Sequence, residues 1–139
     1  MSKKRSLVTI EKPILLTGGS GFIGSHMAEA LRASGYNGMI FDHKQGQDIL
    51  DFDSLFRAVS DAGAIFNLAG VLGTNELNDP LAMRRAVEVN VIGALNCLQA
   101  ARLQGIPIVQ VTKPNLWLNT YTITKRAAEE FALIYAREL

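Results

Sequence analysis

A glycine-rich turn constrains the fold of this chain more than any other feature of its sequence. Gly18, Gly21 and Gly24 are spaced G-x-x-G-x-x-G, and the shorter pattern G-x-G-x-x-G is met from position 19. The apolar run 14–17 before the turn is too short for a helix and predicts a buried parallel strand. Apolar residues at helical spacing follow the turn and stop at Gly35, which predicts a helix. The order is therefore strand, glycine turn, helix.

This order is typical of a site for a pyrophosphate group. Glycine lets the backbone turn tightly and approach the phosphates, whose charge meets free N–H groups and the positive end of the following helix. Phe22 and Ile23 begin that helix, so we expect them beside the ligand together with Gly18, Gly21 and Gly24. The alternative is a tight turn that only packs the strand against the helix.

Short apolar runs and helical patterns alternate along the rest of the chain. We expect further strands at 39–41, 64–68 and 106–111. We expect further helices around 55–59, from Pro80 to Gly105 as one helix or two that meet near Gly93, and from about Thr120 to Leu139. This alternation predicts an α/β fold with a doubly wound parallel sheet, in which ligands bind beyond the carboxyl ends of the strands.

One connection is too short for a complete sheet of this kind. Only seven residues lead from Asp42 to Ile49, whereas a crossover between parallel strands takes a dozen or more. We therefore expect the sheet to be abbreviated between its second and third strands, with one strand and one helix missing there.

Asp42 ends the second expected strand, 18 residues after Gly24. A carboxylate at this place accepts hydrogen bonds from the ribose hydroxyls of a dinucleotide and repels a 2′-phosphate, which favours NAD over NADP. Lys44 partly offsets that repulsion, and the alternative role for Asp42 is a turn or helix cap. Asp48 and Ile49 are expected to line the adenine, although Asp48 is equally compatible with a turn.

Tyr121 and Lys125 lie four residues apart in the last expected helix, so both side chains emerge on one face. A free tyrosine has a pKa of about 10, and a neighbouring ammonium favours its phenolate. The pair therefore indicates a general base next to a cation. The alternative is an exposed pair with no function.

Five motifs now stand in order: TGGSGFIG at 17–24, the acid Asp42, NLAG at 67–70, NVIGALNCLQAA at 90–101 and YTITK at 121–125. Together they resemble the short-chain dehydrogenase/reductase superfamily, with its Rossmann-like fold. The extended branch of NAD-dependent epimerases and dehydratases, typical of nucleotide-sugar enzymes, is the most similar. The resemblance runs from about residue 14 to residue 139.

The resemblance implies roles for individual residues. Tyr121 would be the general base, and Lys125 would hold the nicotinamide ribose. Thr112 is the nearest match to the family's substrate-binding hydroxyl, with Thr120 as a rival and an ordinary strand-end hydroxyl as the alternative. Asn90 occupies a motif position, where the alternative is a structural role at a helix irregularity. The residues expected to contact NAD are Gly18, Gly21, Phe22, Ile23, Gly24, Asp42, Asp48, Ile49, Leu68, Ala69, Gly70, Asn90 and Lys125.

The implied activity is that of a sugar-nucleotide epimerase or dehydratase, in which hydride passes to tightly bound NAD. The alternatives are a non-catalytic module for NAD binding or oligomerisation, and a reductase of small carbonyl compounds. Members of this branch continue past the Tyr-Lys helix into a smaller domain that recognises the nucleotide sugar. The given sequence ends on that helix, so by resemblance we expect the substrate domain to be missing from it. A shortened chain, a natural remnant and a half-enzyme completed by another chain are the three explanations.

Composition and charge indicate which kinds of partner and which cellular location to expect for the chain. A polar tail at 1–12 should precede one NAD-binding domain at 13–139, and the net charge of +1 gives no basic face for nucleic acid. The sequence has no apolar run of membrane-spanning length and no signal peptide, and its single cysteine, Cys97, fits a reducing cytoplasm. His26 and His43 lack the spacing of metal ligands. By resemblance, we expect a homodimer through the long helix and the Tyr-Lys helix.

Overall fold

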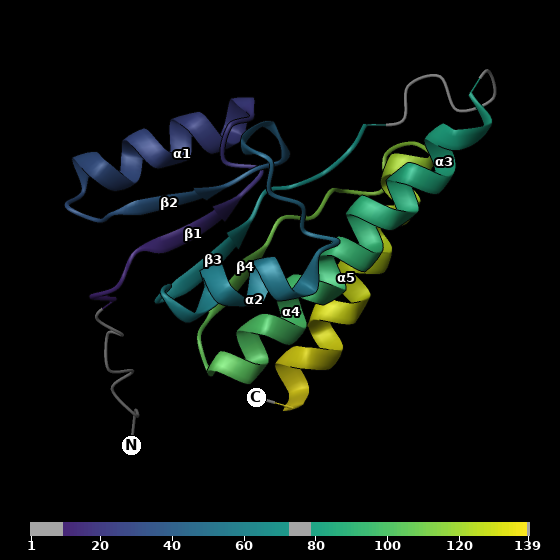
Figure 1. Ribbon diagram of the computed structural model, residues 1–139. Coiled ribbons are helices and arrows are strands. Elements are labelled where there is room, and N and C mark those ends of the chain that lie inside the picture. Colours follow the sequence, from purple (N-terminus) through teal and green to yellow (C-terminus); the bar gives the residue numbers. More distant parts are fainter. Residues whose placement is uncertain (1–9, 73–78, 139) are drawn as a thin grey trace.

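The computed structural model describes residues 10–72 and 79–138 and has a four-stranded parallel sheet at its centre (Figure 1). The strand order is β2-β1-β3-β4, with every neighbouring pair parallel. The expected α/β fold with a doubly wound parallel sheet is therefore confirmed. The strands are β1 (Ile14–Thr17), β2 (Gly38–Phe41), β3 (Ala64–Asn67) and β4 (Ile108–Gln110).

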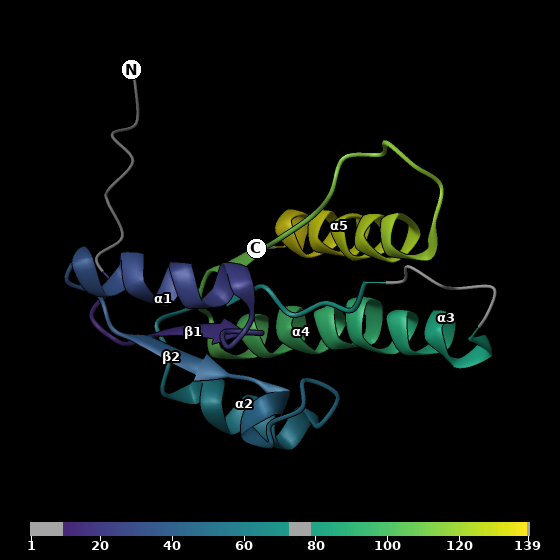
Figure 2. The ribbon, with the colours of Figure 1, turned by 90° about the horizontal axis from the view of Figure 1, so that it is seen from above.

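Helices cover both faces of this sheet. Leu31 of the first helix packs with the inner side chains of β1 on one face, whereas Leu55 and Cys97, from two later helices, form the larger core on the other face. The last helix packs on α4 and on the outer strand β4. The helices are α1 (Phe22–Ala33), α2 (Phe52–Ser60), α3 (Pro80–Val87), α4 (Gly93–Gln104) and α5 (Thr120–Glu138), and Figure 2 shows α4 and α5 running side by side.

The connection between β2 and β3 is abbreviated, as its length predicted. A single 3-10 turn (His43–Gln45) follows β2, and α2 then leads directly to β3 on the other side of β1. Within the described parts of the chain, no strand lies outside β2, so β2 is an edge of the sheet. Strand order reverses between β1 and β3, and at such a point the carboxyl ends of the strands leave a crevice for a ligand.

The long helix is continuous and contains an irregular turn. Asp79 caps it by accepting a hydrogen bond from the N–H of Leu81 at 3.0 Å, and Pro80 occupies the first turn, where proline is favourable. Between α3 and α4, residues Glu88–Ile92 form a π-helical turn. Of the two possibilities that the sequence left open, one helix or two that meet near Gly93, the structure shows one continuous helix with a change of helical pitch at Glu88–Ile92.

The start of the chain takes part in the packing of the domain. Of the expected tail at 1–12, residues 1–9 lie outside the described residues, whereas Ile10 packs against the core beneath α1 and beside Gly63. Lys12 donates a hydrogen bond to the carbonyl of Ser60 at 3.3 Å. Among the described helices, none combines the length and the apolar character that a membrane span requires.

Candidate nucleotide-binding and catalytic site

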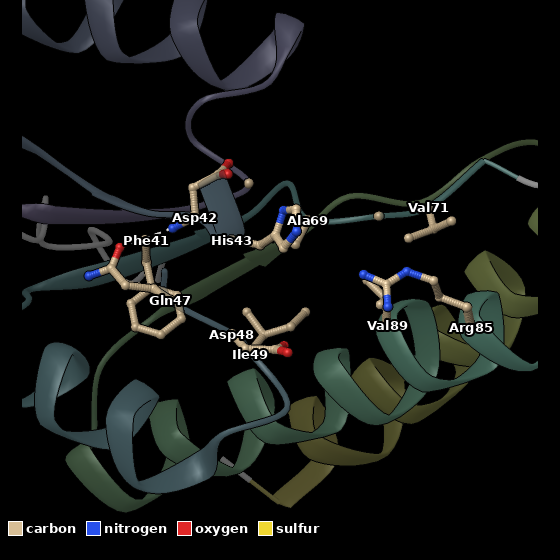
Figure 3. Close-up of a pocket in the computed structure, with 12 residues that line it drawn as sticks. Phe41, Asp42, His43, Gln47, Asp48, Ile49, Ala69, Val71, Arg85 and Val89 are labelled. Carbon is tan, nitrogen blue, oxygen red and sulfur yellow. Dashed lines mark hydrogen bonds between the residues drawn. The ribbon is translucent and has the colours of Figure 1, made fainter. Parts of the chain in front are cut away.

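A cleft lies beyond the carboxyl ends of β1, β2 and β3, where the change of strand order predicts a ligand site (Figure 3). Its cavity volume is about 150 Å³, and it is open to solvent on one side. Six of the residues that the sequence predicted are brought together here, namely Gly18, Asp42, Asp48, Ile49, Ala69 and Gly70. The remaining lining residues are Phe41, His43, Gln47, Val71, Arg85 and Val89.

The glycine turn packs too closely for larger side chains. Gly18 has a φ of +67°, and a β-carbon there would lie 2.8 Å from the backbone of Ala69. A β-carbon on Gly24 would lie 2.5 Å from the carbonyl oxygen of Gly18. Gly21 caps α1 without a side chain, so the N–H groups of Phe22 and Ile23 in the first turn are free for a ligand. Seven of the residues expected to contact NAD are not among the residues that line the cleft, namely Gly21, Phe22, Ile23, Gly24, Leu68, Asn90 and Lys125.

Asp42 performs the capping role and also lines the cleft. Its two carboxylate oxygens accept hydrogen bonds from the N–H groups of Ser20, at 2.9 Å, and Lys44, at 2.8 Å. It thereby connects the glycine turn to the 3-10 turn after β2. Each carboxylate oxygen still has a free lone pair for a hydroxyl donor. Asp48 likewise closes a turn, since it accepts a hydrogen bond from the N–H of Leu50 at 2.9 Å, and it also lines the cleft.

Gly70 is the point at which the Tyr-Lys helix meets the loop after β3. A β-carbon on Gly70 would lie 3.4 Å from Oδ1 of Asn90, 3.6 Å from Nζ of Lys125 and 4.0 Å from Cε2 of Tyr121. The structure therefore places Tyr121 and Lys125 next to Gly70, which lines the cleft, although neither of the two is itself a lining residue. They are not an exposed pair, because Lys125 is only 2% exposed.

Lys125 carries its ammonium in an unusual setting. Its burial lowers the pKa of this ammonium below the ordinary value of 10.5. Among residues 10–72 and 79–138, no group accepts a hydrogen bond from Nζ. A buried ammonium with three donors and no protein acceptor fits a ligand that brings hydroxyl oxygens, such as a ribose.

Asn90 connects the loop after β3 to α5. Its Oδ1 accepts from the N–H of Val71 at 2.7 Å, and its Nδ2 donates to the carbonyl of Val71 and to Oγ1 of Thr124, both at 2.9 Å. Thr124 in turn donates to the carbonyl of Thr120 at 2.8 Å, one residue before Tyr121. The structural role at a helix irregularity is therefore observed, because Asn90 lies within the π-helical turn.

Thr112 is not brought to Tyr121. Its hydroxyl donates to Oε2 of Glu129 at 2.6 Å and accepts from the N–H of Lys113. Glu129 is eight residues beyond Tyr121, or about 12 Å along the helix axis. Thr120, the rival hydroxyl, is buried directly before Tyr121 in the first turn of α5.

The ends of three neighbouring strands are joined by polar side chains beneath the cleft. Thr17 donates to Oδ1 of Asn67 at 2.5 Å, and Asn67 donates to Oε1 of Gln110 at 2.8 Å. Cys97 is buried below this row, and burial raises the pKa of its thiol to about 12. A thiol with so high a pKa is a poor nucleophile at neutral pH.

Comparison with known proteins agrees with this geometry. Residues 14–112 match the NAD dependent epimerase/dehydratase family, which covers most of the chain. The chain belongs to this family. The expectation drawn from the five motifs is confirmed, and NAD is the cofactor by which the family is described.

Relatives of this chain include enzymes of several activities. It is 33% identical over 109 residues to a UDP-N-acetyl-alpha-D-glucosaminuronate decarboxylase of Bacillus cytotoxicus, which covers 66% of this chain and 33% of the relative. It is 28% identical over 110 residues to GDP-mannose 3,5-epimerase 1 of Oryza sativa subsp. indica, which covers 67% of this chain and 28% of the relative. The chain thus spans about a third of the length of the curated relatives it matches.

Solved structures share the fold. A UDP-glucose 4-epimerase of Thermus thermophilus, in complex with NAD, superposes with a TM-score of 0.73 at 24% identity and covers 91% of this chain and 51% of that one. MoeE5 in complex with UDP-glucuronic acid and NAD superposes with a TM-score of 0.72 at 25% identity, and the match covers 89% of this chain and 49% of that one. The chain therefore spans about half of each of these structures.

Several cleft residues of this family member escaped the sequence reasoning. Arg85 and Val89 are four residues apart, and Gly93 follows at the same spacing, so all three share one helix face. Ile49 packs against Gly93, which places the Asp48–Ile49 segment beside that face. Because Val89 and Arg85 lie four and eight residues before Gly93, this spacing could have predicted that both lie on the same helix face as Gly93. Gln47 accepts a hydrogen bond from the N–H of Asp42 at 3.1 Å, and nothing in the sequence indicates this contact.

Proposed function

We propose that this chain binds NAD in the cleft and forms the cofactor-binding and proton-transfer part of a sugar-nucleotide epimerase or dehydratase. The observation that carries the proposal is the buried ammonium of Lys125, which has no described protein acceptor and lies, with Tyr121, next to Gly70, which lines the cleft. A charge in this setting needs a polar ligand, and a nicotinamide ribose supplies two hydroxyls.

Each part of the cofactor has a matching group in the cleft. Asp42 would accept hydrogen bonds from the adenosine ribose, and the glycine turn with the start of α1 would hold the diphosphate. Lys125 would donate to the nicotinamide ribose. When bound, NAD supplies a hydride acceptor that can also return the hydride.

Tyr121 is proposed as the general base. Its phenol oxygen would take the proton of a sugar hydroxyl while the hydride on the same carbon leaves, and it would give the proton back when the hydride returns. The net reaction is then redox-neutral, as in epimerisation. A sugar nucleotide is the proposed substrate because relatives are named as enzymes of UDP- and GDP-linked sugars.

Calorimetry with NAD and NADP tests the cofactor assignment. We expect NAD to bind more tightly than NADP, since a 2′-phosphate would meet the carboxylate of Asp42. Asp42→Ser should narrow the difference between the two cofactors. Tighter binding of NADP by the unmodified chain would overturn the role of Asp42, and binding of neither would overturn the proposed function.

Turnover of UDP- and GDP-sugars tests the role of Tyr121. We expect Tyr121→Phe to lower the rate by about 10²- to 10⁴-fold, the usual contribution of general acid–base catalysis, with NAD affinity unchanged. Tyr135→Phe is the matched control, because Tyr135 donates a hydrogen bond to Gln99 at 3.0 Å and lies far along α5. Equal rates in the two variants would contradict the assignment.

One observation favours a second candidate, a non-catalytic NAD-binding module. The hydroxyl of Thr112 is bonded to Glu129 and is not beside Tyr121, so the expected partner for the substrate hydroxyl is not in place. A chain that binds NAD and turns over no nucleotide sugar in the same assays would support this candidate.

We also propose that the chain forms a homodimer through the long helix and α5. Large apolar side chains are exposed on both, including Ile92 and Leu103 on the long helix and Leu133 and Ile134 on α5. Exposed apolar surface on two neighbouring helices is typical of an interface between subunits.

A further inference from the structure

Arg85 is a cleft residue to which neither the motifs nor the proposed function assigns a role. It belongs to α3, and Figure 3 shows its guanidinium extending from that helix into the cleft, close to Val71 and Val89. Val89 lies one helical turn further along on the same face. The side chain is exposed to solvent in the cleft and is not part of the packed core.

The charges that line the cleft are unevenly distributed. Asp42 and Asp48 are its carboxylates, and among the described lining residues Arg85 alone has a permanent positive charge. In the described parts of the chain, Arg85 has no ion pair or hydrogen bond. Its neighbour Arg84 differs, because its guanidinium pairs with Glu88 at 3.1 Å on the outer side of the helix.

We propose that Arg85 binds the diphosphate of the dinucleotide, an inference that rests on the proposed binding of NAD in this cleft. The two phosphates carry negative charge that Asp42 and Asp48 repel and that a guanidinium attracts. A guanidinium also matches phosphate oxygens with two parallel hydrogen bonds. The glycine turn and the start of α1 supply N–H donors, and Arg85 adds the full positive charge that these backbone groups lack.

The position of Arg85 gives it a second effect. Since it comes from α3, a bond from its guanidinium to the diphosphate would join the long helix to the glycine turn across the bound ligand. Arg85 would then select for ligands with a diphosphate, because adenosine alone offers it no charge.

The test measures affinity by calorimetry for NAD, ADP-ribose and adenosine. ADP-ribose keeps both phosphates without the nicotinamide, and adenosine has no phosphate. We expect Arg85→Gln to weaken the affinities for NAD and ADP-ribose by about 10- to 100-fold, which is the effect of losing hydrogen bonds to a charged group. The affinity for adenosine should change by less than about twofold. Arg85→Lys should be intermediate, since it keeps the charge without the paired donors.

Arg84→Gln is the matched control, because it removes the adjacent guanidinium from the outer side of the helix and should leave all three affinities unchanged. The affinity of the unmodified chain for NAD should also fall more steeply with added salt than that of Arg85→Gln. Equal NAD affinities in Arg85→Gln and the unmodified chain would overturn the role of Arg85 alone. An equal loss of affinity for adenosine would show that Arg85 acts on the adenosine half, and it would also overturn the role of Arg85 at the diphosphate. An unmodified chain that binds neither NAD nor ADP-ribose would overturn both this role and the proposed function.

Discussion

Lys125 shows how a single residue can be unfavourable for folding and useful for binding. Burying an ammonium without an acceptor costs free energy, and the lowered pKa of Lys125 expresses that cost. A ligand whose oxygen atoms accept hydrogen bonds from Nζ would remove much of this cost. Part of its binding free energy would therefore come from satisfying the buried ammonium. The sequence predicted the position of Lys125 from the four-residue spacing, but it could not reveal that the charge lacks a protein partner.

We expect Lys125→Met to raise the free energy of unfolding of the ligand-free chain at neutral pH. Below the lowered pKa of the folded state, both states hold the proton and the cost is constant. As the pH rises from that value towards 10.5, the folded chain releases the proton first, so the wild-type chain gains stability relative to the variant. The gain is about 1.4 kcal/mol for each unit by which folding lowers the pKa.

Urea denaturation at a series of pH values between neutrality and 10.5 measures this difference. Lys44→Met, which removes an exposed ammonium, is the control. Its free energy of unfolding, plotted against pH, should run parallel to that of the wild-type chain. Parallel curves for Lys125→Met as well would show that the ammonium costs nothing in the folded state.

At the scale of elements, the π-helical turn is the feature that arranges the site. The wider turn at Glu88–Ile92 contains Asn90, whose amide groups bond both backbone groups of Val71 and the side chain of Thr124. An ordinary α-helix makes no such turn, and π-helical turns are frequent at functional sites. Their sequence pattern is the same as that of an α-helix, so the sequence predicted an irregularity at Asn90 without its form.

Asn90→Ala should destabilise the chain because it leaves the N–H and the carbonyl of Val71 without partners. We expect a loss of about 1–3 kcal/mol in the free energy of unfolding, the usual cost of unsatisfied buried groups. Asn96→Ala, in the same helix, removes a single bond to the carbonyl of Ile49 and should cost only about 0.5–1.5 kcal/mol. Chemical denaturation compares the two, and a smaller effect at Asn90 than at Asn96 would contradict the tethering role.

Strand boundaries show where local chemistry overrides an apolar pattern. The run at 106–111 predicted a six-residue strand, whereas β4 contains only Ile108–Gln110. The N–H of Ile106 bonds instead to the carbonyl of Ala101 at the end of α4, and Pro107 has no N–H to offer a neighbouring strand. Helix ends follow residue type more closely, since Asp51, Asp79 and Gly105 are the helix caps and belong to residue types that favour these positions.

At the scale of the whole molecule, the abbreviated connection decides the shape of the cleft. Because β2 is an edge strand and α2 follows almost at once, the short segment Asp42–Ile49 forms one wall of the cleft and the long helix forms another. The sequence predicted the missing strand from length alone. It could not predict that the helix face carrying Arg85 and Val89 would lie opposite that segment, since this depends on how Ile49 packs on Gly93.

The proposed dimer is also tested at this scale. We expect light scattering to give twice the mass of one chain, and the double variant Leu103→Glu with Ile134→Glu to give a single chain, because charges would replace apolar side chains that are 57% and 55% exposed. Leu116→Glu, which alters a leucine that is 66% exposed in the loop before α5, should remain a dimer. A single-chain mass for the wild-type protein at all concentrations would contradict the proposal.

The tether at Asn90 has a thermodynamic consequence for the two proposed binding events. It joins the loop that carries Gly70 to the helix that carries Ile134. Restricting the motion of one segment therefore restricts the motion of the other. A cofactor that immobilises the loop would lower the entropic cost of fixing α5 against a second subunit. Because such coupling is reciprocal, dimerisation would tighten cofactor binding by the same factor.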